Sequence, residues 1–118
     1  MSDATTARRL DLFTTLDFEG FNKQNWEVFG NLHTDDVICK VNGTRTEDLE
    51  SHLAYCQQTF HRAPDTRIAE HILKFGDGEW TCTVGLMTGM GEPFQMVTVA
   101  RWRGDQICEE YIYTNRAG

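Results

Sequence analysis

The chain has 118 residues, 40% of them hydrophobic, and a net charge of −7. This length predicts a single domain over residues 1–118, and the composition is that of a folded protein rather than a disordered one. The 11 Lys and Arg residues are scattered, which argues against a nucleic-acid partner because phosphate recognition needs clustered positive charge. No apolar run approaches the roughly 20 residues of a bilayer span, so no membrane partner is expected.

The cysteines and the N-terminus indicate where the protein resides. The N-terminal residues lack a basic region followed by an apolar stretch, so no secretory signal is predicted. The four cysteines form no CxxC pair and lie among apolar neighbours, which predicts reduced thiols in a cytoplasmic protein. Metal ligands paired at short spacing are also missing, so neither a metal site nor another cofactor is expected.

The first third of the chain has the apolar spacing of two helices. The stripe of the first helix is formed by Ala7, Leu10, Phe13 and then Leu16 or Asp17. The stripe of the second helix is formed by Trp26, Phe29 and Leu32. The second helix is expected to end near residues 33–36, and a short strand is predicted over residues 37–41. Asn42-Gly43 then marks a turn.

A third helix is predicted after this turn. Residues 44–47, Thr-Arg-Thr-Glu, fit a capping box, in which a hydroxyl and a carboxylate satisfy two free backbone N–H groups. Pro64 closes the element. The inward stripe contains Leu49, His52, Leu53, Cys56 and Phe60. A histidine is therefore expected on the buried face of this helix.

Everything from Ile68 onward has the pattern of antiparallel strands, predicted at 67–75, 79–89, 94–103 and 106–114 and joined by glycine-containing turns. In the first of these strands, the period of two places Ala69, His71, Leu73 and Phe75 on one face. Helices gathered first and strands gathered after them predict an α+β fold, a curved antiparallel sheet covered by about three helices. Such a cone offers an apolar interior to a small ligand.

Three segments, 26–37, 64–89 and 98–115, resemble the SnoaL-like polyketide cyclases and ester cyclases. These are part of the nuclear-transport-factor-like, or ketosteroid isomerase-like, superfamily, and the middle segment is similar to that of many bacterial members. The resemblance implies a cone-shaped, cystatin-like fold and a homodimer formed through the outer face of the sheet. Two departures are that the loop at 89–93 is short and that Asn115 stands where many relatives carry Asp.

The resemblance also implies positions for site residues on the last two strands. It places Thr98 where relatives assist proton transfer or stabilise an oxyanion, and it favours Glu110 as the inward acid. Counting residues across the hairpin at 104–105 pairs Trp102 with Ile107 and places Glu109 inward instead. An inward Glu110 would therefore require a β-bulge.

Among apolar neighbours the imidazole of His71 is expected to be desolvated and neutral near pH 7, as a general base requires. The ordinary alternative is a core histidine bonded to a neighbour. We expect His71 to line the cavity as the base, Glu110 to be the acid or to orient that base, and Thr98 to donate a hydrogen bond. The residues expected to contact a ligand are His52, Trp26, Phe29, Phe75 and Met96.

The leading hypothesis is therefore a SnoaL-like protein with a pocket for a compact apolar or polyketide-like molecule. Its chemistry would be cofactor-independent acid–base catalysis, namely cyclisation, isomerisation or elimination through an enol or enolate. The alternative is a non-catalytic ligand-binding or dimerisation module whose histidines are structural. The two inward histidines favour the enzyme, and the missing Asp positions favour the module.

Overall fold

The structure is a computed structural model that describes residues 3–116. Its helices are α1 (Asp3–Thr15), α2 (Trp26–Asn31) and α3 (Leu49–Arg62), with a six-residue π-helical turn, η1 (Leu16–Phe21), directly after α1. Its strands are β1 (His33–Val41), β2 (Thr44–Thr46), β3 (Arg67–Asp77), β4 (Trp80–Thr88), β5 (Phe94–Arg103) and β6 (Gln106–Arg116). Within residues 3–116, no helix is long and apolar enough to cross a membrane.

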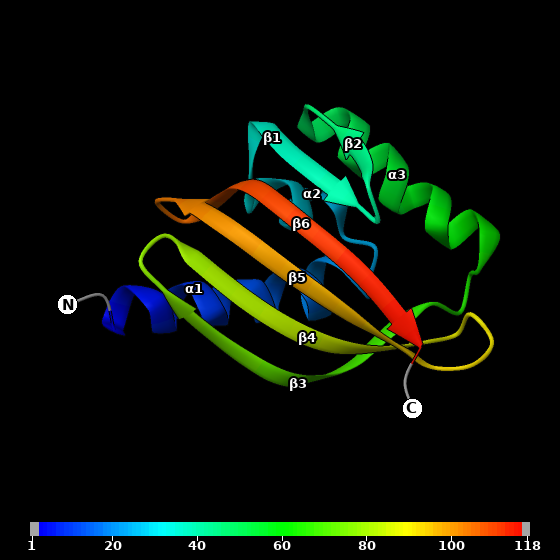
Figure 1. Cartoon of the computed structure of the whole chain (residues 1–118). Coiled ribbons are helices and arrows are strands. Elements are labelled where there is room, and N and C mark those ends of the chain that lie inside the picture. The colour runs from blue at the N-terminus through cyan, green and yellow to red at the C-terminus, as the bar shows by residue number, and fades with distance from the viewer. Residues whose placement is uncertain (1–2, 117–118) are drawn as a thin grey trace.

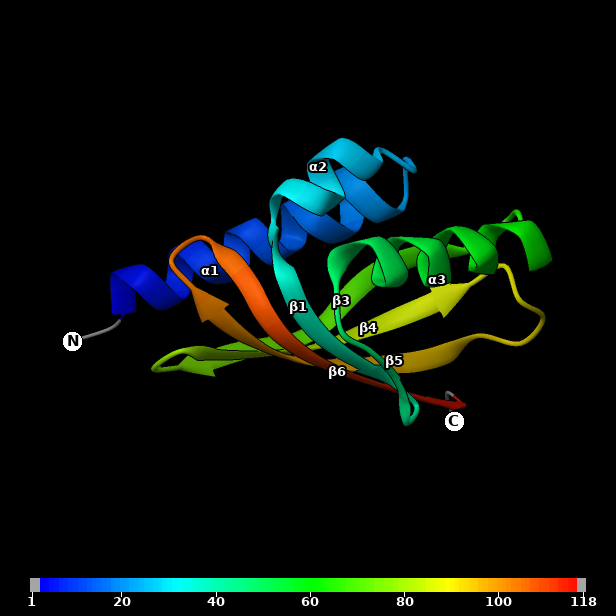
Figure 2. The ribbon, with the colours of Figure 1, turned by 90° about the horizontal axis from the view of Figure 1, so that it is seen from above.

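The six strands form one curved sheet in the order β2-β1-β6-β5-β4-β3. All neighbouring strands are antiparallel except β1 and β6, which run parallel. The helices lie on one side of this sheet, called the inner face below (Figures 1 and 2). The predicted α+β architecture, a curved sheet covered by helices, is confirmed.

The start of α3 differs from the predicted capping box. Residues 44–46 form β2, which turns back at Asn42-Gly43 and pairs with the end of β1. The helix is capped instead by Asp48, whose Oδ1 accepts a hydrogen bond from the backbone N–H of Ser51 at 2.7 Å. Asp is among the preferred N-cap residues, and here it directly precedes the helix. The helix buries three of its predicted inward residues, His52, Cys56 and Phe60.

The core lies between the helices and the inner face of β1, β5 and β6. The indole of Trp102 is 2% exposed, and its Nε1–H donates to the Thr81 hydroxyl at 2.9 Å. The burial of this indole thus leaves its N–H satisfied. The buried apolar cluster comprises Phe13, Leu16, Phe29, Val37, Cys39, Cys56, Ala100, Trp102 and Ile107.

Strand β3 changes face along its length, which overturns one prediction. The pairing with β4 shifts register between Ile68 and Glu70 and again between His71 and Leu73. A bulge inserts an extra residue, so side chains on its two sides no longer follow one alternation. His71 stays on the inner face, opposite Gly85, but Phe75 pairs with Cys82 on the outer face and is 55% exposed. The prediction that Leu73 and Phe75 share a face with His71 is therefore wrong, because both follow the second bulge.

The outer face of the sheet carries a group of exposed large apolar side chains, here called the outer apolar patch. Its members are Leu73, Phe75, Trp80 and Tyr113, which are 39–55% exposed. They come from β3, β4 and β6 and lie opposite the helices, because their neighbours in the strand alternation are buried or face the inner side. Several exposed large apolar side chains on one face of a sheet are typical of an interaction face.

Candidate functional site

Two polar clusters are buried between the helices and the sheet. The first, called the Asp17–His71 dyad below, joins η1 to β3. His71 Nε2 lies 2.7 Å from Asp17 Oδ2, and the two side chains are 6% and 5% exposed. The rings of Phe13 and Phe18 pack against the imidazole, with centroids at 5.9 and 4.9 Å. A histidine paired with a carboxylate in this way has a fixed ring orientation.

The π-helical turn at the end of α1 brings Asp17 to the inner side. Asp17 follows Phe13 by four residues, so both belong to one face of the helical segment, and both Leu16 and Asp17 are buried. The end of the turn is fastened to β3 by Asn22. Its side-chain amide donates to Ile68 O and accepts from Ile68 N, each at 2.8 Å. This paired contact fixes the helical turn relative to the strand that carries His71.

Burial brings the titration of Asp17 closer to neutral pH. Burial raises the pKa of Asp17 to about 6, against the lowering effects of the hydrogen bond with His71 and of its charge. The negative charge of Glu110 raises the pKa of Asp17 further. A group that titrates close to the working pH is suited to general acid–base catalysis.

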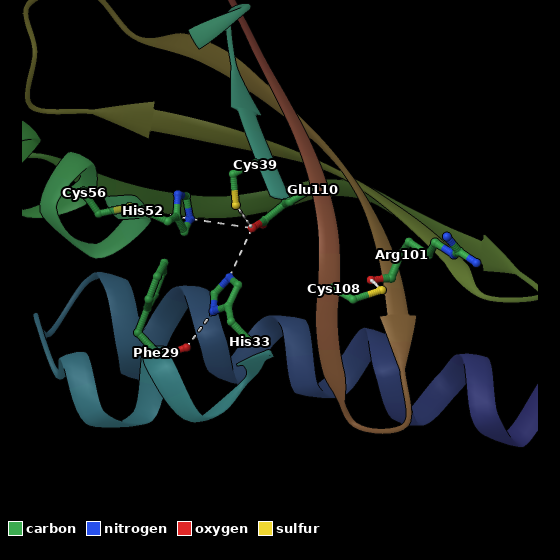
Figure 3. A network of polar contacts seen from close by, with 8 residues as sticks. All are labelled: Phe29, His33, Cys39, His52, Cys56, Arg101, Cys108 and Glu110. Atoms are coloured by element: carbon green, nitrogen blue, oxygen red, sulfur yellow. Dashed lines mark hydrogen bonds and ion pairs between the residues drawn. The ribbon is translucent and has the colours of Figure 1, made fainter. Parts of the chain in front are cut away.

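The second cluster joins β1, α3 and β6 and is called the His33–His52–Glu110 cluster (Figure 3). Glu110 Oε1 lies 3.1 Å from His33 Nε2 and 3.6 Å from His52 Nε2. All three side chains are at most 3% exposed. The Cys39 thiol donates to the same Oε1 at 3.6 Å, and the Cys56 Sγ lies 3.9 Å from His52 Nε2.

Burial and neighbouring charge set the protonation of this cluster. Burial lowers the pKa of His52 to about 4, which keeps its imidazole neutral at pH 7. Burial alone would raise the pKa of Glu110, but the hydrogen bond with His33 and the positive charge of that imidazole hold it below its ordinary value. Burial raises the pKa of the Cys39 and Cys56 thiols, which are therefore neutral.

A cavity of about 1090 Å³ opens between α3 and the sheet. Its wall includes His52 and Cys56 from α3, so this cavity reaches the edge of the second cluster. At its other side lie Met87, Met90 and Met96, which flank the short β4–β5 loop. Flexible thioethers of this kind adapt to the shape of a ligand.

A tight backbone contact closes one side of this cavity. A side chain on Gly89, in the cavity wall, would place its Cβ only 2.0 Å from the carbonyl oxygen of Asp65, and its φ is +95°. Only glycine fits such a close approach, because it has no Cβ and tolerates positive φ.

The structure brings together some of the predicted site residues. Glu110 faces inward, as the resemblance implied, and a bulge between Arg101 and Trp102 produces that orientation. The pairing of Trp102 with Ile107 that hairpin counting predicted is confirmed, but its placement of Glu109 on the inner side is wrong. Thr98 is 2% exposed on the inner face and pairs with Ile112. Its predicted role as a donor stays a prediction.

Not all predicted ligand contacts fit the cavity. His52 and Met96 line the cavity. His71 is absent from the cavity wall, so the prediction that its ring lines the cavity is wrong; the ring is held by Asp17 beneath η1 instead. Trp26 and Phe29 pack into the aromatic core, and Phe75 lies on the outer face.

Sequence reasoning misses Asp17 and His33 as members of polar clusters. The helical stripe offers Asp17 only as one alternative to Leu16. His33 follows Phe29 by four residues, so it continues the stripe of the second helix, and its Nδ1 bonds the Phe29 carbonyl at 2.8 Å. Helical spacing is thus the available signal for both.

The open sheet with helices on one face defines an α+β protein of the nuclear-transport-factor-like, cystatin-like fold. The family model described as a SnoaL-like domain matches residues 17–110, and the chain belongs to this family. No curated protein matches the sequence.

Solved structures with low sequence identity share the fold. A SnoaL-like candidate polyketide cyclase from Jannaschia sp. superposes with a TM-score of 0.83 at 15% identity, covering 93% of this chain and 87% of that chain. A candidate ketosteroid isomerase from Kribbella flavida gives 0.82 at 17% identity, covering 96% and 82%. IdmH, a candidate polyketide cyclase from Streptomyces antibioticus, gives 0.77 at 20% identity, covering 91% of each chain.

Proposed function

We propose that the protein binds a compact, largely apolar molecule in the cavity and catalyses an acid–base transformation of it, with His71 as the base and Asp17 as the group that orients it. The observation that carries this proposal is the buried 2.7 Å contact between His71 Nε2 and Asp17 Oδ2. In a water-poor interior such a pair holds the imidazole in one tautomer and stabilises the imidazolium formed by proton transfer.

The dyad is close to the cavity along the sheet. Met87 lines the cavity, and Gly85, two residues earlier on β4 and on the same inner face, lies opposite His71. Two residues along a strand span about 7 Å. The thioether of Met87 is the flexible element at this boundary. A substrate that displaces this side chain would therefore bring its reactive carbon next to the imidazole.

The chemistry that fits these groups is the removal of a proton next to a carbonyl. His71 would accept that proton on Nδ1, because its Nε2–H is donated to Asp17, and the resulting enolate would then isomerise, cyclise or eliminate. The names of the similar structures, candidate cyclases and a candidate isomerase, agree with this class. The Thr98 hydroxyl, buried on the inner face, is the proposed donor to the developing oxyanion.

One observation favours the alternative of a non-catalytic binding module. Of the three residues proposed for catalysis from sequence, His71, Thr98 and Glu110, none lines the cavity. In that case the dyad would serve only to fasten η1 to β3, and the cavity would hold a ligand without changing it.

Proton exchange with solvent separates the two functions. Small apolar ketones and β-keto esters are first screened for binding by ligand-detected NMR, and those that bind are incubated with the protein in D₂O. We expect deuterium to enter the carbon next to the carbonyl, and His71→Phe to abolish this exchange while keeping the fold. The matched control is His61→Phe, because His61 is exposed on α3.

The outcomes have distinct meanings. Binding with no exchange above the buffer rate, or exchange that His71→Phe leaves unchanged, would reject the catalytic proposal in favour of the binding module. If His71→Phe does not fold, Asp17→Asn replaces it, since the amide still bonds the imidazole but cannot stabilise its charge. We expect that variant to retain ligand binding and lose most of the exchange.

A further inference from the structure

We propose that the His33–His52–Glu110 cluster is a binding site for a first-row divalent metal ion, Zn²⁺ or Fe²⁺, at the inner end of the cavity. The sequence predicts no metal site, because these three residues stand far apart in the chain and form no ligand motif. The fold brings their ligand atoms, His33 Nε2, His52 Nε2 and Glu110 Oε1, within 4.8 Å of one another.

The spacing of the three atoms suits one shared ion. Zinc lies about 2.0–2.2 Å from its histidine and carboxylate ligands, which places two such ligands about 3.0–3.5 Å apart at bond angles of about 90–110°. Glu110 Oε1 lies 3.1 Å from one histidine nitrogen and 3.6 Å from the other. The three ligand atoms span up to 4.8 Å, so an ion held by both imidazoles would draw the two rings together by about 1 Å, by the same bond lengths.

The hydrogen bonding of His33 leaves its inward nitrogen as an acceptor. Its Nδ1 lies 2.8 Å from the backbone carbonyl of Phe29, and a carbonyl oxygen only accepts, so Nδ1 carries a proton. In the neutral ring Nε2 then has a lone pair, which faces Glu110 Oε1 at 3.1 Å. Two acceptors at this distance require a cation between them, either a proton or a metal ion. A backbone carbonyl on the other ring nitrogen is also the usual support of a metal-binding histidine.

His52 supplies the second nitrogen and the route of entry. Its Nδ1 is buried without a hydrogen-bond partner, and its Nε2 is 3.6 Å from Glu110, beyond a normal hydrogen bond. This buried imidazole therefore lacks a hydrogen bond at Nδ1 and has no close contact with Glu110. It also lines the cavity, as does Cys56, so the cavity is the side from which an ion or a bound molecule would reach the cluster. Two histidines, one carboxylate and an open position are the ligand set of catalytic zinc and of non-haem iron(II).

The site shares no residue with the Asp17–His71 dyad, so this proposal stands apart from the proposed base. A metal ion there would act on the other side of a substrate, as a Lewis acid that polarises a carbonyl oxygen. The nearby Cys39 and Cys56 thiols would add soft ligands or compensating negative charge if the ion lowers their pKa.

The test is binding of a single ion to the full chain. The protein is treated with a chelator, dialysed, and titrated with Co²⁺ while visible absorption is recorded, and with Zn²⁺ by calorimetry. We expect one ion per chain, with Zn²⁺ displacing Co²⁺. Glu110→Gln should weaken binding more than about 100-fold, since loss of a ligand exceeds the 10–100-fold cost of removing an outer partner.

The variants are chosen so that a negative result is decisive. In Glu110→Gln the new side-chain amide can donate an N–H to His33 Nε2, so the fold should survive this change. The matched control is Glu109→Gln, the same substitution one residue earlier, where the side chain bonds Tyr111 on the outer side and should leave binding unchanged. If Glu110→Gln does not fold, His52→Phe replaces it and should also lose the ion.

Two results would overturn the proposal. Folded wild-type protein that binds no ion at millimolar Co²⁺ or Zn²⁺ would show that a proton, and not a metal, joins His33 to Glu110. Equal affinity in wild type, Glu110→Gln and His52→Phe would place the ion elsewhere on the protein. Neither result bears on the proton-exchange assay of the dyad, so failure of the metal site and failure of the proposed function are distinguishable.

Discussion

Replacing Asp17 by asparagine should remove a pH dependence of stability that the wild type shows. The pKa of this carboxyl is raised from 3.8 to about 6 in the folded chain, chiefly by burial. The folded state therefore binds the proton more tightly than the unfolded state. A raised pKa contributes stability that is fully present below about pH 4 and is lost as the pH rises through about 6.

The size of the effect follows from the two pKa values. A difference of about 2 corresponds to about 3 kcal/mol in the free energy of unfolding, because each tenfold change in proton affinity is about 1.4 kcal/mol. Asparagine resembles the protonated acid and keeps a hydrogen bond with His71. Relative to wild type, Asp17→Asn should therefore become more stable by about 3 kcal/mol between about pH 4 and pH 7.

Urea unfolding at four pH values across this interval measures the difference directly. The control is Asp11→Asn, the same substitution at an exposed position of α1, which reports any effect of net charge. A difference that stays flat with pH would contradict the raised pKa. A variant that becomes less stable than wild type as the pH rises would show that Asp17 is ionised and forms a structural ion pair with a charged His71.

Two further properties follow from the outer face and the thiols. The outer apolar patch should form a homodimer that buries at least about 1,000 Å², so light scattering at micromolar concentration should give twice the chain mass. Phe75→Lys should yield a monomer. The control Tyr55→Lys, at an exposed aromatic on α3, should remain a dimer. A monomeric wild type would reject this. All four cysteines are free, so denatured, unreduced protein should titrate four thiols. A count of two or fewer thiols in the denatured protein would mean that disulfides form. In the native protein the thiols of Cys39 and Cys56 should react far more slowly than those of the half-buried Cys82 and Cys108.

The elements that could be predicted from sequence are those set by local signals. Glycine turns between alternating runs placed β3 to β6 within two residues of their observed ends. The register of β3 could not be predicted, because its two bulges depend on how the strand meets β4. The side of the sheet predicted for Phe75 was consequently wrong. The side predicted for His71, which precedes the second bulge, was right.

In the candidate site, the inward residues could be predicted from sequence but their buried partners could not, for a related reason. The inward orientation of His71, His52 and Glu110 follows from local period and from family resemblance. The identity of their partners does not follow from these signals, because Asp17 is 54 residues from His71 and His33 is 77 residues from Glu110. Such contacts depend on how η1 and the start of β1 pack, which no spacing rule describes. The π-helical turn that carries Asp17 leaves no clear mark in the sequence.

The two clusters should influence each other electrostatically, and this gives the sharpest joint prediction. The negative charge of Glu110 is one of the causes that raise the pKa of Asp17. A divalent cation bound to Glu110 would neutralise that charge and add positive charge, so the pKa of Asp17 should fall. Carbon-13 NMR titration of the Asp17 carboxyl, with and without Zn²⁺, measures the change. The shift should disappear in Glu110→Gln and persist in Glu109→Gln. A pKa of Asp17 that does not respond to one bound equivalent of Zn²⁺ would mean that the ion is not at Glu110.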